Sequence, residues 1–442
     1  MAAVATAAAV AVAEVVAADR VGFRPVMSDE LVRLSTLASG IRVVTERMPE
    51  ARSVSVGAYV GVGGRDEPDD AAGASHFLEH LLFKGTAERT AREIAVAIDA
   101  VGGDMNAYTS REHTAFYARV PAPAYPMGLR LLLDVLAAPA LRPNEVDGER
   151  EVILEELAAA EDDPDDVVHT RLAEALFPGH PLGREVLGEE ATIEALSRDA
   201  IAAFHERWYR STNIVVAAAG AIDHDELCAA VDGFLGDRDP GAAPLRNAPV
   251  DPPVARVVAP HPGEQAHLAL GWRAVDQDDP ERYPLAFANY VLGGGMASRL
   301  FQAVREERGL AYSIFSSTAL HADAGALTVS AATSPARAAE VLTVIEAEID
   351  GLLAGGVTDE EHRTALGYLE GSLVLGLEEP GSRMSRIGRS VVSRGEVVPI
   401  DEHLARFRAV TVDDVNRVLR TLLLGQRSLA LAGPAALEAV GV

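Results

Sequence analysis

The sequence contains a single cysteine, Cys228, among its 442 residues. One cysteine excludes an intrachain disulfide and fits a reducing compartment. Long hydrophobic runs are also missing, because no uninterrupted apolar stretch reaches the roughly 18 residues that a membrane-spanning helix requires. These absences predict a soluble, cytoplasmic protein without a membrane partner, and the 48% of hydrophobic residues suffice to build buried cores.

Basic residues are scarce compared with acidic ones. The chain has 39 Lys and Arg residues against 66 Asp and Glu residues, which gives a formal net charge of −27. Nucleic acids are bound through clustered cations, so this balance excludes nucleic acid as a partner. An acidic surface either attracts basic ligands or serves only solubility, and the composition leaves both interpretations open.

The N-terminal stretch MAAVATAAAVAVAEVVAADR has only part of the pattern of a targeting signal. No Lys or Arg precedes its weakly hydrophobic run, and Glu14 and Asp19 follow that run. A secretory signal begins with positive charge, and an organelle transit peptide is rich in arginine. We therefore expect residues 1–25 to form a disordered leader.

The same order of features occurs on both sides of a proline-rich stretch at residues 233–262. In each half an alternating strand pattern, an acidic break and a helical pattern follow one another, and a later strand precedes a long amphipathic helix. This order predicts an α+β protein with two homologous domains, each a mainly antiparallel sheet covered by helices. We place the domains at residues 26–237 and 261–442, with a linker at 238–260.

The stretch GASHFLEHLLFKGT places His76, Glu79 and His80 inside an apolar segment. Positions i, i+3 and i+4 share one face of a helix, so the three side chains project together. Two imidazoles suit a zinc ion, and the carboxylate between them is free to act as a base. A catalytic zinc usually takes three protein ligands, so a third must come from elsewhere. Taken alone, the pattern also occurs by chance, and His80 would fit a packed histidine.

The segment NEVDGEREVILEELAAAEDDP, residues 144–164, predicts a helix between two prolines. At roughly 100° per residue, Val146, Val152, Ile153 and Leu157 define an apolar face, and Glu149 and Glu156 lie about 20° apart in the middle of it. Buried carboxylates require a partner or a metal ion. We therefore assign Glu156 as the third zinc ligand and Glu149 as the outer carboxylate that orients a ligand histidine.

The remaining glutamates of this segment provide a contrast. Glu151 and Glu155 point away from the apolar face, toward solvent. With Glu149 and Glu156 both used at the metal, Glu79 is left free as the general base. The helical motif and the two inward-facing glutamates were identified independently, which strengthens the prediction of a metal site.

The motifs HFLEHLLFKGT, NAYTSREHTAFYARV and EREVILEELAAAEDDP resemble those of the zinc peptidases of the pitrilysin, insulin-degrading enzyme and mitochondrial processing peptidase family. Residues 179–188, 204–220 and 292–315 resemble the same family, so the similarity extends from about Gly40 to the end. In this family, an inverted zinc (inverzincin) motif supplies two histidine ligands and the base. A distal glutamate completes the site, and the resemblance selects Glu156 for this role.

The resemblance also implies substrate-binding residues. Residues 106–120 have the β-branched and aromatic content of a strand, and the corresponding strand in the family lies at a sheet edge, where an extended substrate pairs with it. This implies that Asn106, Ala107 and Thr109 contact the substrate. The residues alone do not distinguish such an edge strand from an ordinary inner strand.

In the second half, Arg305 and Tyr312 match a pair that reaches over the bound peptide in family members and helps to hold the scissile carbonyl. Without the resemblance, Arg305 would be a solvated helix residue and Tyr312 a packed aromatic. Family members that act as single chains carry four such domains, whereas this chain carries two. Because the zinc motif and the arginine–tyrosine pair lie on one chain, the resemblance implies a homodimer.

The predicted function is that of a zinc-dependent endopeptidase with one Zn²⁺ per chain, which hydrolyses peptides or unfolded segments inside a chamber. The acidic charge favours peptides with basic residues among the substrates. Two alternatives remain: a non-catalytic family member that acts as a scaffold or assembly subunit, and a zinc-binding protein without chemistry. The retained zinc ligands argue against the first, and a free Glu79 beside them argues against the second.

Overall fold

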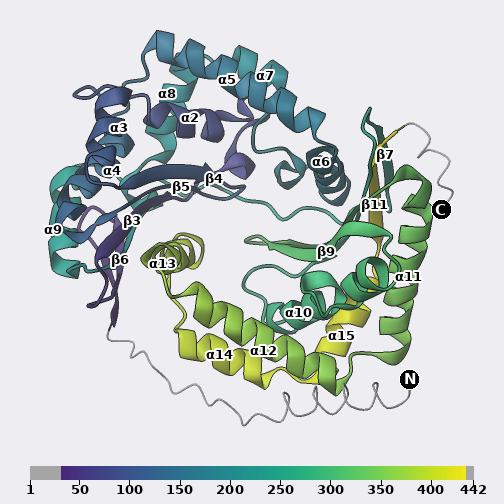
Figure 1. Ribbon diagram of the computed structural model, residues 1–442. Helices are drawn as coiled ribbons and strands as arrows, with labels where there is room; N and C mark the ends of the chain where they lie inside the picture. The colour runs from purple at the N-terminus through teal and green to yellow at the C-terminus, as the bar shows by residue number, and fades with distance from the viewer. Residues whose placement is uncertain (1–30, 435–442) are drawn as a thin grey trace. The chain divides into compact units, whose positions relative to one another are not determined.

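The computed structural model of the protein describes residues 31–434. The expected leader, residues 1–25, lies outside the described residues. Two mixed, mainly antiparallel sheets carry helices on their faces, so the prediction of an α+β fold with two sheet-and-helix halves is confirmed (Figure 1). We call the part up to the end of α9 the first half and the part from β7 onward the second half.

The first sheet has six strands in the order β1-β2-β6-β3-β5-β4. Only β2 and β6 run parallel, and all other neighbours are antiparallel. The strands are β1 (Val32–Thr36), β2 (Arg42–Arg47), β3 (Ser53–Val60), β4 (Asp104–Thr109), β5 (Thr114–Pro121) and β6 (Ile214–Gly220).

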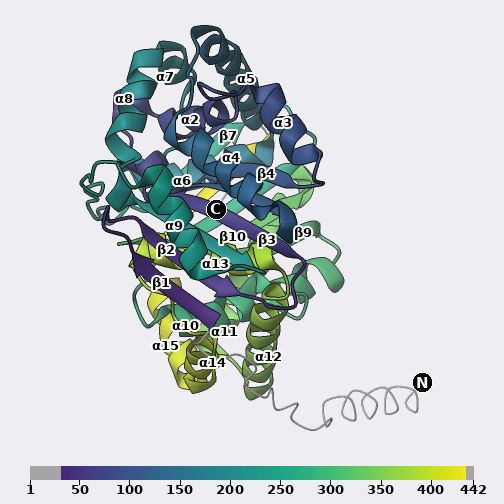
Figure 2. The ribbon, with the colours of Figure 1, turned by 90° about the vertical axis from the view of Figure 1, so that its left-hand side faces the viewer.

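Helices of the first half cover one face of this sheet (Figure 2). They are α2 (Ala74–Leu82), α3 (Ala91–Asp99), α4 (Tyr125–Ala137), α5 (Pro143–Asp162), α7 (Glu190–Ala195), α8 (Arg198–Trp208) and α9 (His224–Leu235), whereas α6 (Pro164–Leu176) packs on the second sheet. The main core lies between the sheet and α2, α4, α5, α8 and α9. Strand β3 is buried almost along its whole length, which explains its nearly continuous run of small and apolar residues.

The predicted single strand at residues 106–120 is wrong in one respect, because the structure divides it into the hairpin β4–β5. The turn at residues 110–113 has the sequence SREH, which lacks the Gly and Pro that usually mark a hairpin. Ser110 closes the turn instead, since its backbone N–H and its hydroxyl both donate to the carbonyl of His113. Strand β4 thereby becomes the last strand of the sheet.

The second sheet has five strands in the order β7-β11-β8-β10-β9. They are β7 (Arg256–Pro260), β8 (Ala266–Ala274), β9 (Ala311–Leu320), β10 (Gly325–Thr333) and β11 (Arg427–Gly433). The helices are α10 (Arg282–Asn289), α11 (Ala338–Gly355), α12 (Asp359–Gly376), α13 (Pro380–Arg394), α14 (Ile400–Ala409) and α15 (Val412–Leu423), with π-helical turns at Tyr290–Gly294 and Phe301–Glu306.

The predicted linker at 238–260 is too long at its C-terminal end. Its last five residues form β7, which pairs in parallel with β11 at the edge of the second sheet. Pro260 ends this strand, a position that tolerates proline because an edge strand leaves one row of backbone groups unpaired. The linker proper is the segment without strand or helix between α9 and β7.

Each half contributes a helix to the sheet of the other half, which the prediction of two consecutive domains did not include. Helix α6 buries Val168, Leu172 and Leu176 against alanines of the second sheet. Helix α13 buries Met384 and Ile387 against the face of the first sheet opposite α2. The two halves are therefore interlocked across the described residues.

Two glycines let α13 approach the first sheet closely. A Cβ on Gly388 would lie 2.2 Å from the ring of Tyr59, and a Cβ on Gly57 would lie 2.7 Å from Sδ of Met384. A buried ionic cluster anchors the same helix, because Glu46 of β2 pairs with Arg383 and, at 3.2 Å, with Arg386. A polar anchor thus accompanies the apolar contact of α13 with the sheet.

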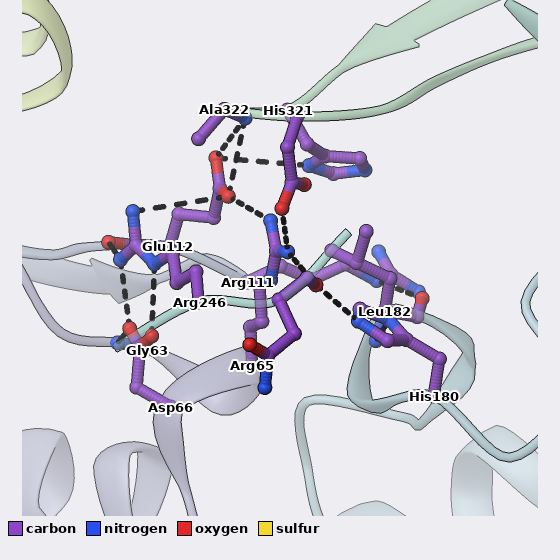
Figure 3. Close-up of polar contacts among 12 residues, drawn as sticks. Gly63, Arg65, Asp66, Arg111, Glu112, His180, Leu182, Arg246, His321 and Ala322 are labelled. Carbon is purple, nitrogen blue, oxygen red and sulfur yellow. Dashed lines mark hydrogen bonds and ion pairs between the residues drawn. The ribbon is translucent and has the colours of Figure 1, made fainter. Parts of the chain in front are cut away.

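A polar network joins the β4–β5 turn of the first half to the β9–β10 turn of the second (Figure 3). Its centre is Arg65, whose side chain is only 2% exposed. The Arg65 guanidinium donates to Glu112 at 2.6 Å, to Asp323 at 2.6 Å and to the carbonyl of Asn247 at 2.8 Å. One arginine thus holds two hairpin turns and the linker together.

Further contacts complete this network (Figure 3). The backbone N–H of Ala322 donates to both carboxylate oxygens of Glu112, at 3.2 and 3.1 Å. Arg246 of the linker donates to the Asp66 carboxylate and to the carbonyl of Glu112. Because Glu112 lies in the β4–β5 turn, the network fixes the end of the edge strand β4.

Across residues 31–434, every helix is too short or too polar to cross a lipid bilayer.

Candidate metal centre

Helix α2 begins at a tightly packed glycine and a buried carboxylate. Gly73 has φ of 92°, a left-handed conformation that favours glycine, and a Cβ there would meet the Leu187 carbonyl at 2.7 Å. Glu67 accepts hydrogen bonds from the N–H groups of Gly73 at 2.7 Å and Ser75 at 2.6 Å. These bonds satisfy free amides at the helix N-terminus and fix the start of α2. Burial raises the pKa of Glu67 to about 7, against the effect of these two donors.

The structure brings His76, His80 and Glu156 together. The Nε2 atoms of the two histidines lie 3.2 Å apart. Each of them lies 3.6 Å from Oε2 of Glu156. The three atoms form a nearly regular triangle, and the three residues are a group of the kind that could hold a metal ion.

The protonation of these groups agrees with metal binding. The Glu149 carboxylate only accepts, so His80 donates from Nδ1 at 3.0 Å and its Nε2 carries a lone pair. Burial, followed by the neighbouring His80, lowers the pKa of His76 to about 4, so its imidazole is neutral at pH 7. The lone pair of His80 and the Glu156 carboxylate thus meet at one point, an arrangement that a cation stabilises.

The spacing of the three atoms fits zinc in particular. A tetrahedral ion with bonds of about 2.0–2.1 Å keeps its ligand atoms roughly 3.3 Å apart. The observed separations of 3.2 and 3.6 Å match this geometry. Two imidazole nitrogens and one carboxylate are also a common ligand set of catalytic zinc. The donor set therefore fits the metal that the sequence predicts.

Glu149 lies behind this triangle and holds His80 in place. It is buried, and its second oxygen lies 2.5 Å from Nζ of Lys84. The lysine neutralises the carboxylate and fixes its orientation, while the carboxylate fixes the tautomer and the ring of His80. The interpretation of Glu149 as an orienting carboxylate agrees with this geometry.

Replacing Glu149 by alanine is expected to weaken zinc binding by about 10–100-fold, because His80 loses the acceptor that orients its ring. Competition with a chromophoric chelator measures this affinity. Glu151→Ala is the matched control, since Glu151 lies on the exposed side of the same helix. Equal affinities for the two variants would contradict the orienting role.

Glu79 lies beside the triangle without joining it. Its Oε2 accepts a hydrogen bond of 2.6 Å from the hydroxyl of Thr109, the last residue of β4. Burial raises the pKa of Glu79, and the Thr109 bond opposes this rise. A carboxylate with a raised pKa is a stronger base, so Glu79 is suited to accept a proton near the metal.

The helical-face prediction for α5 holds at seven of eight positions, and Val146, Ile153 and Leu157 are buried as expected. Glu149 faces the core and Glu156 reaches the site, although 42% of the Glu156 side chain is exposed. Glu151 and Glu155 are exposed as expected. Val152 was placed on the apolar face and is instead 43% exposed.

The three residues implied as substrate contacts lie on the edge strand β4, which pairs with β5 and with no other strand of residues 31–434. Asn106 is exposed, and its Oδ1 accepts the N–H of Ala107 at 2.8 Å. Ala107 packs on the same side as the α2 core. Thr109 joins the strand to Glu79. The free edge of β4 therefore runs directly past the candidate base.

Arg305 and Tyr312 lie together in the second half. The Arg305 guanidinium packs 4.5 Å from the ring of Tyr312 and 4.8 Å from that of Phe301. Tyr312 is 82% exposed. Within residues 31–434, no hydrogen bond or ion pair joins either side chain to His76, His80, Glu156 or Glu79. The structure brings the pair together but does not place it in contact with the metal centre of the same chain.

Lys84 and Glu67 are the residues that the sequence did not identify. Lys84 had a weak signal, because it lies four positions after His80 and two residues after the end of α2. Glu67 had none, because its contact with the start of α2 depends on the loop between β3 and the helix. Both support the metal ligands by fixing the helix or the outer carboxylate.

Two family models match the chain. The model described as Insulinase (Peptidase family M16) matches residues 42–190, which contain all the candidate ligands. The model described as Peptidase M16 inactive domain matches residues 195–368. An uncharacterized zinc protease of Streptomyces coelicolor is 44% identical over 91% of this chain and 90% of its own length. The chain belongs to the M16 family of peptidases.

Other comparisons agree with this M16 assignment. The uncharacterized zinc protease YmxG of Bacillus subtilis is 34% identical over 91% of this chain and 98% of its own. A protease from Helicobacter pylori has the same fold, with a TM-score of 0.86 and 21% identity over 91% of this chain and 99% of that chain. The peptidase M16 inactive domain of Pseudomonas fluorescens superimposes with a TM-score of 0.84 at 20% identity, over 91% and 98% of the two chains.

Proposed function

We propose that this M16 protein is an active zinc-dependent endopeptidase that hydrolyses peptides or unfolded segments, with one zinc ion per chain. One observation carries the proposal. The Glu79 carboxylate, which is not one of the three candidate ligands, lies next to the triangle of His76, His80 and Glu156 and accepts a hydrogen bond from the edge strand β4. A structural zinc site has no need of an additional free carboxylate, whereas hydrolysis requires a base.

In this proposal His76, His80 and Glu156 hold the zinc ion, and Glu149 fixes the ring of His80. A zinc ion bound there acidifies water and polarises the substrate carbonyl. Glu79 accepts the proton of the attacking water and then passes it to the leaving amine. Thr109 keeps the Glu79 carboxylate oriented through its hydroxyl.

The substrate backbone is proposed to pair with β4. An edge strand offers a row of N–H and C=O groups that an extended peptide satisfies. Asn106, Ala107 and Thr109 lie along this edge, and Thr109 contacts the base. Pairing at β4 would therefore bring a peptide bond to Glu79 without requiring a particular side chain.

We also propose that two copies of the chain form a homodimer around a chamber in the cytoplasm. Arg305 and Tyr312, exposed and separate from the metal centre of their own chain, would then be available to a peptide held by the other copy. The net charge of −27 would attract peptides with basic residues from a distance. Light scattering of the purified protein would detect the dimer as about twice the chain mass of 46.6 kDa.

Digestion of an unbiased peptide library, with and without a zinc chelator, tests the endopeptidase. We expect internal cleavage that the chelator abolishes and added Zn²⁺ restores. The alternative function, a non-catalytic scaffold or assembly subunit, predicts no cleavage from protein that elemental analysis shows to contain zinc. Protein that retains no zinc after gentle purification and resupply would contradict both the metal centre and the reaction.

A further inference from the structure

A cavity of about 980 Å³ lies on the face of the first sheet opposite α2. The side chains of β4 point alternately to the two faces of this sheet. Met105 and Ala107 pack with the core beneath α2, whereas Tyr108 packs with Tyr117 on the side of α13. The cavity is lined from the sheet by Ser55, Asp104, Tyr108, Tyr117 and Arg119, and from α13 by Ser385, Arg386, Arg389 and Arg394.

The register of the sheet connects this cavity to the free edge of β4. Directly paired residues on neighbouring strands point to the same face. Asp104 pairs with Arg119 and Asn106 with Tyr117, so these rows of side chains cross β5 and β4 on the cavity side. A peptide added to β4 would continue the rows. Every second side chain of that peptide would point to the cavity, and the others would point to the side of Glu79.

The lining of the cavity is basic, although the chain as a whole is strongly acidic. Its lining includes four arginines and one acidic residue, Asp104. Two of the arginines have carboxylate partners at hydrogen-bond distance, since Arg386 binds Glu46 at 3.2 Å and Arg394 binds Asp278 at 3.0 Å. A third, Arg119, has Glu379 at 3.7 Å, a pair that is open to solvent.

Arg389 differs from these three. It is exposed, and no hydrogen bond or ion pair connects its guanidinium to any residue between 31 and 434. Its charge acts on the neighbouring strands, because it opposes the rise in the pKa of Tyr108 that burial causes. An unpaired guanidinium beside phenol groups in a concave site is suited to bind a carboxylate through paired N–H donors.

We propose that this cavity is a subsite for an acidic side chain of the peptide substrate, with Arg389 as the anion-binding residue and Tyr117 as a further polar residue of its lining. The inference rests on the proposed peptidase function and on pairing of the substrate with β4. It adds a local preference to the long-range attraction of basic peptides. Preferred substrates therefore carry mixed charge, with Asp or Glu at a residue that faces α13.

Matched peptides test this subsite. One cleaved sequence, acetylated and amidated at its ends, is prepared with Glu, Gln or Lys at each position around the scissile bond. At one position, or at positions two apart, the wild-type enzyme is expected to prefer Glu over Gln by about tenfold in kcat/KM, the effect of one charge-assisted pair. The peptide with Lys at the same position is expected to be cleaved more slowly than the peptide with Gln.

Variants assign the preference to Arg389. Arg389→Gln should bring the ratio of Glu to Gln peptides close to one, and Arg389→Lys should retain part of the preference because the charge remains. Arg420→Gln is the control, since Arg420 is an exposed arginine on α15 and does not line the cavity. That variant should keep the wild-type ratio.

The outcomes separate this subsite from the proposed function. Cleavage with equal rates for Glu and Gln at every position, or a preference that appears only when the C-terminus is free, would overturn the subsite and leave the peptidase intact. If the zinc-loaded enzyme cleaves no peptide, the peptidase fails, and anisotropy of the same labelled peptides with Glu79→Gln protein tests the subsite alone. Tighter binding of the Glu peptide that Arg389→Gln removes would support it, and equal binding would overturn it.

Discussion

Replacing Glu79 by glutamine is expected to abolish peptide hydrolysis while zinc stays bound. Glutamine has the same shape, and its carbonyl oxygen still accepts the Thr109 hydroxyl, so the helix and the edge strand remain joined. It cannot take a proton from water, and loss of a general base costs about 10²–10⁴ in rate. Steady-state kcat/KM on a fluorogenic peptide and metal analysis of the same sample measure both properties.

A matched control isolates the position of the carboxylate. Glu155→Gln removes one negative charge from an exposed site of α5, close in sequence to the ligand Glu156. It should retain both zinc and activity, because an exposed charge contributes little to the site. A zinc-loaded Glu79→Gln protein with wild-type turnover would show that another group is the base.

The local geometry of the metal centre was predictable from sequence because it depends on helical periodicity. His76 and His80 lie on one face of α2, and Glu149 and Glu156 reach the same place from α5, as the rotation of roughly 100° per residue implies. Periodicity failed at Val152. A hydrophobic residue on a helix can remain exposed, and Val152 is exposed although it lies on the same helix as the ligand Glu156.

The packing of helices between the halves was not predictable in the same way. The sequence of α13 has apolar residues at Met384, Ile387 and Val391, which indicates a helix with one buried face. Nothing in that spacing says which sheet covers the face. Gly388 packs against Tyr59 and Gly57 against Met384, and both contacts join residues that are far apart in the sequence. Such matches become visible only in three dimensions.

The edge position of β4 is a further property that depends on topology. Its residues have ordinary strand propensities, and the β4–β5 turn lacks Gly and Pro. The turn is held instead by the network around Arg65, whose partners come from three separate parts of the chain. A substrate-binding edge is thus built from residues that carry no local signal for it.

Replacing Arg65 by methionine is expected to destabilise the protein by about 3–5 kcal/mol, because Asp323 loses its cation and Glu112 keeps only the more distant Arg246, at 3.8 Å. Glu112 and Asp323 are 13% and 25% exposed in their side chains, so water compensates only in part. Denaturant unfolding followed by tryptophan fluorescence measures the change. Trp208 and Trp272 are both buried and report on the first and second halves, respectively.

The same substitution should also reduce kcat/KM at temperatures where the protein remains folded. Without Arg65, Glu112 fixes the β4–β5 turn less firmly, so Thr109 holds Glu79 less firmly and β4 presents a less ordered edge to the peptide. Arg92→Met on the exposed side of α3 is the control and should change stability by less than about 0.5 kcal/mol. If Arg65→Met lowered stability but left kcat/KM unchanged, the network would connect the halves without positioning the base.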